Sequence, residues 1–178
     1  MFYFVYCTDR PGSGPLRERL VEEHWAYMDR FAAELYARGP TLSPDGETAT
    51  GSLHVVDLPS DAAAESFALL EPNWLAGVYE SVVVYRFEDL LGRSMWDFTG
   101  PEGARFLVVA PEKPGTPGTR DVPMAEQDLI VLGRLRSLGD GAVVGIGACV
   151  QAVDAAAVAE MFSGGVVRPW RFGGRPAN

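Results

Sequence analysis

The 178-residue chain has few of the side chains that hold metals, form disulfides or bind polyanions. It contains two cysteines, two histidines and one lysine. Cys7 and Cys149 lie far apart in apolar stretches, and no Cys-x-x-Cys occurs. We therefore expect two buried thiols in a reducing compartment, with neither a structural zinc nor a redox pair. Because a metal centre needs three or four clustered ligands, we expect no metal, and nothing indicates haem or another cofactor.

Positive charge and long apolar runs are also scarce. With 24 acidic and 15 basic residues the net charge is −9, which opposes binding to nucleic acid or anionic membrane surfaces. The longest apolar run, Ala142–Val150, is about half the ~20 residues that a membrane span needs. Met1–Cys7 is apolar but has no basic region before it, which favours a strand over a signal peptide. We predict a cytoplasmic protein whose partner is a small molecule.

Common catalytic motifs are missing as well. The sequence has no P-loop, and no serine lies in a nucleophile elbow. Gly145-Ile146-Gly147 lies within an apolar run and lacks the third glycine of a dinucleotide-binding turn. Any chemistry must therefore come from a different arrangement of side chains.

The first half of the sequence alternates strand and helix patterns. The predicted elements are a strand at 2–8, a helix at 15–36, a strand at 51–58, a helix at 62–70 and a strand at 78–87. Ser60 or Asp61 can cap the second helix. We interpret the order as β-α-β-β-α-β, which has one strand more than these ranges mark; this is the ferredoxin-like pattern of an antiparallel sheet with both helices on one face.

Several pieces of the first half recur in the second. YFVYCTDRPG at Tyr3–Gly12 is echoed by FLVVAPEKPG at Phe106–Gly115, and Asp-Ala-Ala-Ala at 61–64 returns at 154–157. The second copy is shorter, because residues 116–128 leave room for only a turn or two of its first helix. These echoes indicate an internal duplication, whereas the alternative is a single irregular α+β domain.

We therefore predict an α+β chain of two ferredoxin-like repeats whose antiparallel sheets pack as an intrachain pseudo-dimer. Residues 1–92 form the first repeat with the site, 93–103 a packed linker, and 104–178 a shortened second repeat lacking most of its first helix. The second sheet would cover the bare face of the first. The chain could still pair again, so a homodimer remains possible.

Two histidines and one acid are the candidates for chemistry. His24 lies on the helix stripe that faces the sheet, where a histidine is either a packed core residue or a proton carrier. Strand alternation places Ser52, His54 and Val56 on one face. Asp45 lies in a Ser-Pro-Asp-Gly turn, where it is either turn chemistry or a rim carboxylate that accepts the imidazole N–H.

The remaining candidates bind substrate. With one lysine in the chain, cation sites are expected to be guanidinium sites, and Arg17 and Arg38 could hold an anionic oxygen. Tyr27, which flanks His24 on the helix, and His54 complete the predicted substrate-binding set.

Four motifs of the first half together resemble one family. They are His24–Met28 (HWAYM), the Arg38–Glu47 pattern RGP-x-L-x-x-D-G-E, GSLHVVDLPS at 51–60, and the segment from Glu71-Pro72-Asn73 to Val82. This set is similar to the YciI-like (YCII-domain) family. The resemblance implies ferredoxin-like units paired into a dimeric α/β barrel, and a pocket with a His–Asp dyad that maps onto His24 and Asp45. Glu71 stands where an Asp before the Pro is more usual.

The resemblance also implies a class of function. One branch of the family performs cofactor-free dehydrochlorination of a chlorinated hydroxyquinol, so we expect a cofactor-independent lyase or isomerase acting on a small cyclic or aromatic, oxygenated metabolite. The second half has no histidine and no RGP-type turn, so it is interpreted as a degenerate copy and the dyad occurs once per chain. The alternative is a non-catalytic small-molecule-binding or accessory module.

Overall fold

A computed structural model describes residues 1–100, 103–111, 124–162 and 164–175. The strands are β1 Phe2–Asp9, β2 Leu35–Leu42, β3 Ala49–Asp57, β4 Tyr79–Asp89, β5 Arg105–Pro111, β6 Leu129–Arg136, β7 Val143–Gln151 and β8 Val166–Pro169. The helices are α1 Gly14–Arg19, α2 Val21–Asp29, α3 Asp61–Leu69, α4 Pro72–Leu75 and α5 Ala155–Met161, with 3₁₀ turns η1 Met95–Asp97 and η3 Glu126–Asp128. None of these helices has the length and apolarity needed to span a bilayer.

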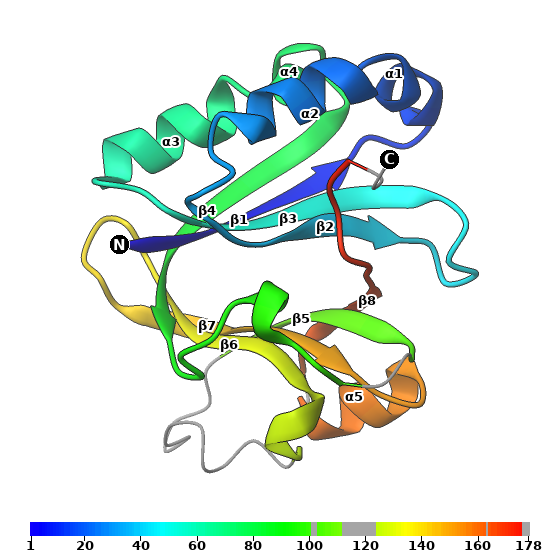
Figure 1. Cartoon of the computed structure of the whole chain (residues 1–178), viewed down its shortest axis with the longest axis vertical. Helices are drawn as coiled ribbons and strands as arrows, with labels where there is room; N and C mark the ends of the chain where they lie inside the picture. The colour runs from blue at the N-terminus through cyan, green and yellow to red at the C-terminus, as the bar shows by residue number, and fades with distance from the viewer. Residues whose placement is uncertain (101–102, 112–123, 163, 176–178) are drawn as a thin grey trace.

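All of these strands belong to one antiparallel sheet of eight, in the order β2-β3-β1-β4-β6-β7-β5-β8. The first four follow the ferredoxin-like order, and the last four repeat it. The halves join through β4 and β6, from Arg86↔Arg136 to Asp89↔Gly133, and an isolated bridge between Thr41 and Trp170 connects the two edges. The sheet therefore curls back on itself into a barrel within one chain (Figure 1).

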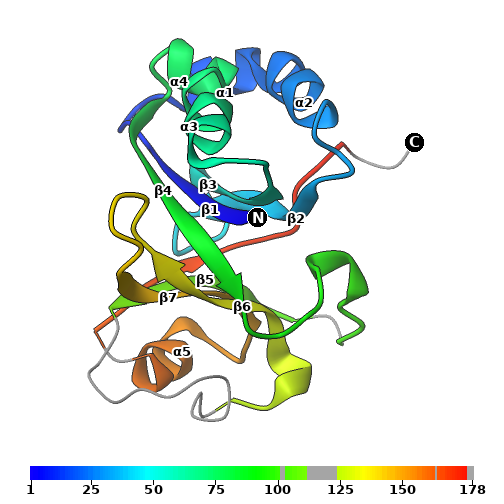
Figure 2. The same cartoon turned by 90° about the vertical axis from the view of Figure 1, so that its left-hand side faces the viewer.

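The helices cover the two outer faces of this sheet (Figure 2). Helices α1 to α4 lie over the first half-sheet, formed by β1 to β4, and α5 lies over the second half-sheet, formed by β5 to β8. Apolar side chains that include Phe4, Leu53 and Leu107 fill the space between the half-sheets. The expected α+β fold of paired ferredoxin-like units is confirmed. The two sheets are not separate layers, however, because β4 and β6 make them continuous.

The first predicted helix is wrong beyond Asp29. Helix α1 ends at Arg19, α2 ends at Asp29, and Leu35 begins β2, the strand that the predicted order required before β3. The side chain of Leu35 continues the helical apolar spacing, but it is buried against the sheet and its Cα pairs with that of Val56. Pairing with β3 outweighs the local helical pattern because it satisfies the backbone and buries the same apolar residues.

The second repeat keeps the helix cap of the first. Ser60 Oγ accepts a hydrogen bond from Ala63 N at 3.2 Å, and Asp154 Oδ1 accepts one from Ala157 N at 2.9 Å. The predicted loss of its first helix falls mostly on residues 112–123, which lie outside the described residues. In the linker Met95 is fully buried between the half-sheets, so this connection is packed. The domain boundaries at 92 and 103 stay a prediction.

Candidate active site

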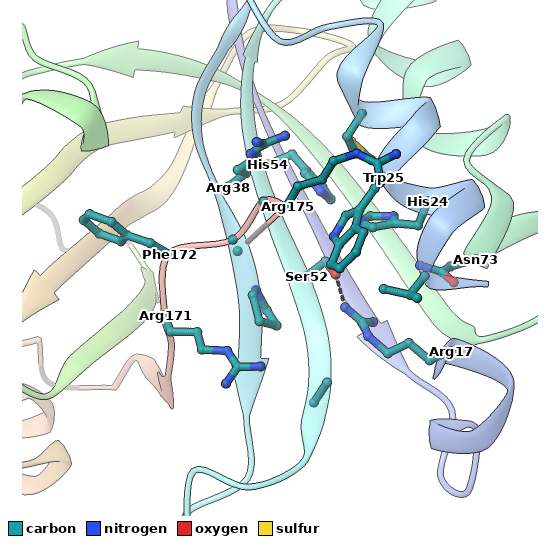
Figure 3. A pocket seen from close by; sticks show the side chains of 17 residues that line it. Arg17, His24, Trp25, Arg38, Ser52, His54, Asn73, Arg171, Phe172 and Arg175 are labelled. Atoms are coloured by element: carbon teal, nitrogen blue, oxygen red, sulfur yellow. Dashed lines mark hydrogen bonds between the residues drawn. The ribbon is translucent and has the colours of Figure 1, made fainter. Parts of the chain in front are cut away.

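A cavity of about 470 Å³ lies between α1–α2 and the edge of the first half-sheet (Figure 3). Its third wall is the segment that follows β8, which runs back along β2. The lining residues are Arg17, Val21, His24, Trp25, Met28, Arg38, Gly39, Pro40, Ala49, Ser52, His54, Asn73, Arg171, Phe172, Gly173, Gly174 and Arg175. Both repeats therefore contribute to the cavity.

The imidazole of His24 is held by the carboxylate of Glu71. Nδ1 of His24 lies 2.5 Å from Oε1 of Glu71, whose other oxygen caps α4 by accepting a hydrogen bond from Trp74 N at 3.1 Å. The Glu71 side chain is 3% exposed and that of His24 is 15% exposed. Because the Glu71 carboxylate accepts a hydrogen bond from Nδ1–H and so keeps the proton on that nitrogen, Nε2 is left as the atom that can exchange a proton with a ligand.

Asp45 is not the partner of His24. Its carboxylate lies in the exposed turn between β2 and β3, where Oδ1 accepts hydrogen bonds from Ser43 Oγ at 2.5 Å and Glu47 N at 3.1 Å. These bonds lower the pKa of Asp45. The expected His24–Asp45 pair is therefore wrong and the carboxylate belongs to Glu71. The segment that connects α3 to α4 folds back beneath α2 and places Glu71 next to His24, whereas Asp45 stays in the turn between β2 and β3.

His54 lies on the floor of the cavity, on the side of β3 that faces the helices; the strand alternation predicted that it shares a face with Ser52 and Val56 but not which face that is. The residue is 3% exposed, and its ring centroid lies 5.9 Å from that of His24 and 5.7 Å from that of Phe67. Burial lowers the pKa of His54 well below 6.5, and the electrostatic influence of the nearby His24, Arg17 and Arg38 lowers it further. The imidazole is therefore neutral and can donate or accept a hydrogen bond.

Arg17 is held in place by protein groups. Its Nη1 donates to Asp9 Oδ1 at 2.8 Å and its Nη2 to Ser52 Oγ at 2.7 Å. Ser52 Oγ also accepts a hydrogen bond from Tyr79 OH, which in turn accepts one from Asn73 Nδ2. Burial raises the pKa of Asp9 even though Arg17 pulls it down. This network fixes one wall of the cavity, so Arg17 orders the site and has no charge left unmatched.

Tyr27 lies outside the cavity. Its hydroxyl donates to Phe67 O at 3.0 Å, its side chain packs in the core beneath the helices, and burial raises its pKa. The expectation that it touches substrate is not met by this placement. Tyr27 lies on the side of α2 that faces the sheet, and there it packs against Phe67 of α3.

Arg38 stands beside His54, its register partner across β2 and β3. Its guanidinium carbon lies 5.7 Å from the centroid of the Trp96 ring, and burial lowers its pKa. Unlike Arg17, it forms no ion pair with a carboxylate of the described residues.

The segment after β8 supplies cavity residues that the sequence pattern does not indicate. Arg171 and Phe172 line the cavity, and Arg175 reaches over Trp25 to bind Glu22 and Asp29 on α2. The Gly-Arg pairs that recur at 92–93 and 174–175 mark this region in the sequence, but nothing local indicates that it returns to the first repeat.

The cavity is positively lined in an acidic protein. Four of its lining residues are arginines and two are histidines, and none of the described lining residues is acidic. Arg17 and Arg175 are paired with carboxylates, so Arg38 and Arg171 are the arginines of this wall whose charge can attract an anionic ligand. Among the described residues no three or more His, Cys, Asp or Glu side chains are arranged to hold a metal ion.

Residues 1–88, which carry the His24–Glu71 pair, match the family described as the YCII-related domain. An uncharacterized protein of Haemophilus influenzae (strain ATCC 51907 / DSM 11121 / KW20 / Rd) is 30% identical over 95 residues, which cover 49% of this chain and 97% of that protein. The chain belongs to the YCII-related family. Its C-terminal wall residues, 171–175, lie outside the matched region.

A solved structure is also similar to this YCII-related chain. It is the 5-chloro-2-hydroxyhydroquinone dehydrochlorinase of Burkholderia phenoliruptrix AC1100 in complex with 2,5-dihydroxybenzoquinone. It is 30% identical, the match covers 49% of this chain and 94% of that chain, and the TM-score is 0.47.

Proposed function

We propose that this protein is a cofactor-independent enzyme of the lyase or isomerase type, which moves protons on a small cyclic or aromatic, oxygenated metabolite. The observation that carries the proposal is the contact of His24 Nδ1 with Glu71 Oε1, at 2.5 Å, in the wall of the cavity. A buried carboxylate behind an imidazole orients the ring and stabilises the imidazolium that forms when the other nitrogen takes a proton.

The chemistry follows from this pair. Nε2 of His24 would take a proton from a carbon or hydroxyl next to a carbonyl group, leaving the charge on an enolate or phenolate oxygen. The imidazolium, held by Glu71, would then return the proton to another atom in an isomerisation, or to a departing group in an elimination. The positive lining and neutral His54 would stabilise the oxyanion, because hydrogen-bond donors and charges already held in position lower the energy of a developing negative charge.

The size of the cavity supports a small ligand. At about 470 Å³ it is in the lower part of the range of small-molecule sites. The family relation is compatible with a ring-shaped, oxygenated ligand, since a protein 30% identical to about half of this chain is named as a dehydrochlorinase of a chlorinated hydroxyhydroquinone.

The test is turnover of candidate compounds in D2O, followed by proton NMR. The compounds are substituted hydroquinones, hydroxyquinones and cyclic 1,3-diketones, so that both proton exchange and product formation are visible. We expect the wild type to process at least one of them, and His24→Gln to lose about 10²- to 10⁴-fold of that rate. Asp45→Asn is the matched control and should keep full activity.

Two outcomes would contradict the proposal. A substrate processed equally well by His24→Gln would show that the imidazole does not carry the proton. Ligands that raise the melting temperature without exchange or turnover would support the alternative, a non-catalytic small-molecule-binding module.

A further inference from the structure

Among the described residues, Arg38 is a guanidinium without an ion-pair partner. It lies partly buried in the cavity wall, its Nε is fully buried with no hydrogen-bond partner in the described part of the chain, and burial lowers its pKa. The attraction of Asp29 offsets part of this effect, but that carboxylate is bound to Arg175. A charge withdrawn from water without a partner is unfavourable, so its retention here calls for a counter-charge.

The other cationic groups in the wall differ from Arg38. Arg17 is paired with Asp9, and Arg175 is paired with Glu22 and Asp29. Arg171 is exposed and forms no ion pair within the described residues, so it can attract an anion from solvent but is not desolvated. Arg38 therefore combines partial burial, an unpaired charge and a place in the cavity wall.

The neighbours of Arg38 determine which other side chains would contact a ligand whose anionic group binds this arginine. Arg38 and His54 are register partners on adjacent strands, which places their Cβ atoms about 5 Å apart. The His54 ring is in turn 5.9 Å from the His24 ring. His54 is thus a neighbour of both Arg38 and His24, so a ring compound whose anionic group binds Arg38 would extend past His54 toward His24.

We propose that Arg38 binds a carboxylate of the substrate, so that the substrate class is a small ring compound bearing a carboxylate. The planar guanidinium fork matches a carboxylate through two parallel hydrogen bonds. The role as a substrate group rests on the proposed function, whereas anion binding by Arg38 stands independently of catalysis.

The experiment compares two probes by isothermal titration calorimetry with the full-length chain. The probes are 2,5-dihydroxybenzoate and hydroquinone, which share the ring and both hydroxyls and differ in the carboxylate. Inorganic phosphate is a third probe, because it is also an anion that arginine binds. The variants are Arg38→Gln and the control Arg168→Gln, which removes an exposed arginine of β8 that does not line the cavity. Thermal unfolding shows whether each variant is folded.

We expect the wild type and Arg168→Gln to bind 2,5-dihydroxybenzoate at least tenfold more tightly than hydroquinone. Arg38→Gln should bind the two probes equally. Equal affinities in the wild type, failure of the carboxylate probe to bind, preference for phosphate, or an unchanged preference in Arg38→Gln would each overturn the assignment.

A His24→Gln variant separates this inference from the proposed function. If it keeps the carboxylate preference, and no compound is turned over by the wild type, then the enzyme proposal fails and the Arg38 site stands. If turnover is found while the preference is absent, the carboxylate assignment fails and the enzyme proposal stands.

Discussion

Thr41 and Trp170 form an antiparallel bridge between the two edges of the eight-stranded sheet. The contact continues past the bridge, since Arg171 N donates to Pro40 O at 3.3 Å and Gly173 N donates to Arg38 O at 3.0 Å. Through these bonds the second repeat, which carries no histidine, forms one wall of the cavity that contains both histidines of the chain.

This seam depends on a glycine in β2. A Cβ at residue 39 would lie 1.9 Å from the carbonyl oxygen of Arg171, a backbone atom that cannot move aside alone. We expect Gly39→Ala to lower the melting temperature by roughly 2–10 °C, from an overpacking cost of about 1–3 kcal/mol. Hydrogen exchange of residues 170–175 should also become faster. Gly139→Ala, whose Cβ would meet nothing within 4 Å, is the control, and equal stability of both variants would contradict the prediction.

The two candidate carboxylates predict opposite kinetic results. Glu71→Gln keeps an oxygen to cap Trp74 N but removes the charge beside His24, so kcat for a substrate should fall about 10²-fold or more. Asp45→Asn should keep kcat within about twofold, because its side chain contacts only its own turn. Steady-state kinetics measures kcat for both variants, and a larger loss of kcat for Asp45→Asn than for Glu71→Gln would favour the His24–Asp45 pair over the His24–Glu71 pair.

The buried His54 predicts how stability depends on pH. Its pKa is well below 6.5 in the folded protein, so the unfolded chain binds the extra proton as the pH falls through 6.5. The contribution of His54 to the free energy of unfolding is therefore full above pH 6.5 and declines below it. His54→Gln should flatten this acid limb in urea unfolding measured from pH 5 to 8. Parallel pH profiles for the variant and the wild type would count against a neutral, buried imidazole.

The two arginines of the cavity predict stability changes of different sign. Arg17→Gln leaves the largely buried Asp9 carboxylate unpaired, and the free energy of unfolding should fall by about 2–4 kcal/mol. Arg38→Gln removes an unmatched charge, so stability should stay the same or rise. Urea unfolding measures both. In the double variant Asp9→Asn/Arg17→Gln the loss should be smaller than the sum of the single losses, and additivity would show that the pair is not coupled.

The first repeat alone should self-associate. In the whole chain Phe4, Leu53 and Val55 are fully buried between the half-sheets, and a chain ending at residue 92 would expose them. We expect light scattering after gel filtration to show a dimer or larger species for residues 1–92. A folded monomer would contradict the pseudo-dimer arrangement. The same measurement on the whole chain tests the possible homodimer.

Local patterns in the sequence determined most of the first repeat's elements. The alternation in 51–58 placed Ser52 and His54 on the same face of β3, and the repeated Asp-Ala-Ala-Ala pieces marked α3 and α5. These features are encoded by neighbouring residues, whose side-chain period and capping groups do not depend on the rest of the chain. The echoes between the halves likewise indicated the paired fold.

Only the tertiary structure decided which groups meet. The β2 strand replaced the end of the predicted helix because β3 lies beside it. Glu71 contacts His24 in place of Asp45 because the chain between α3 and α4 folds back beneath α2. Arg171 and Arg175 entered the cavity from the far end of the sequence. Residues so far apart carry no local signal of their contact, since the closure of the barrel alone brings them together.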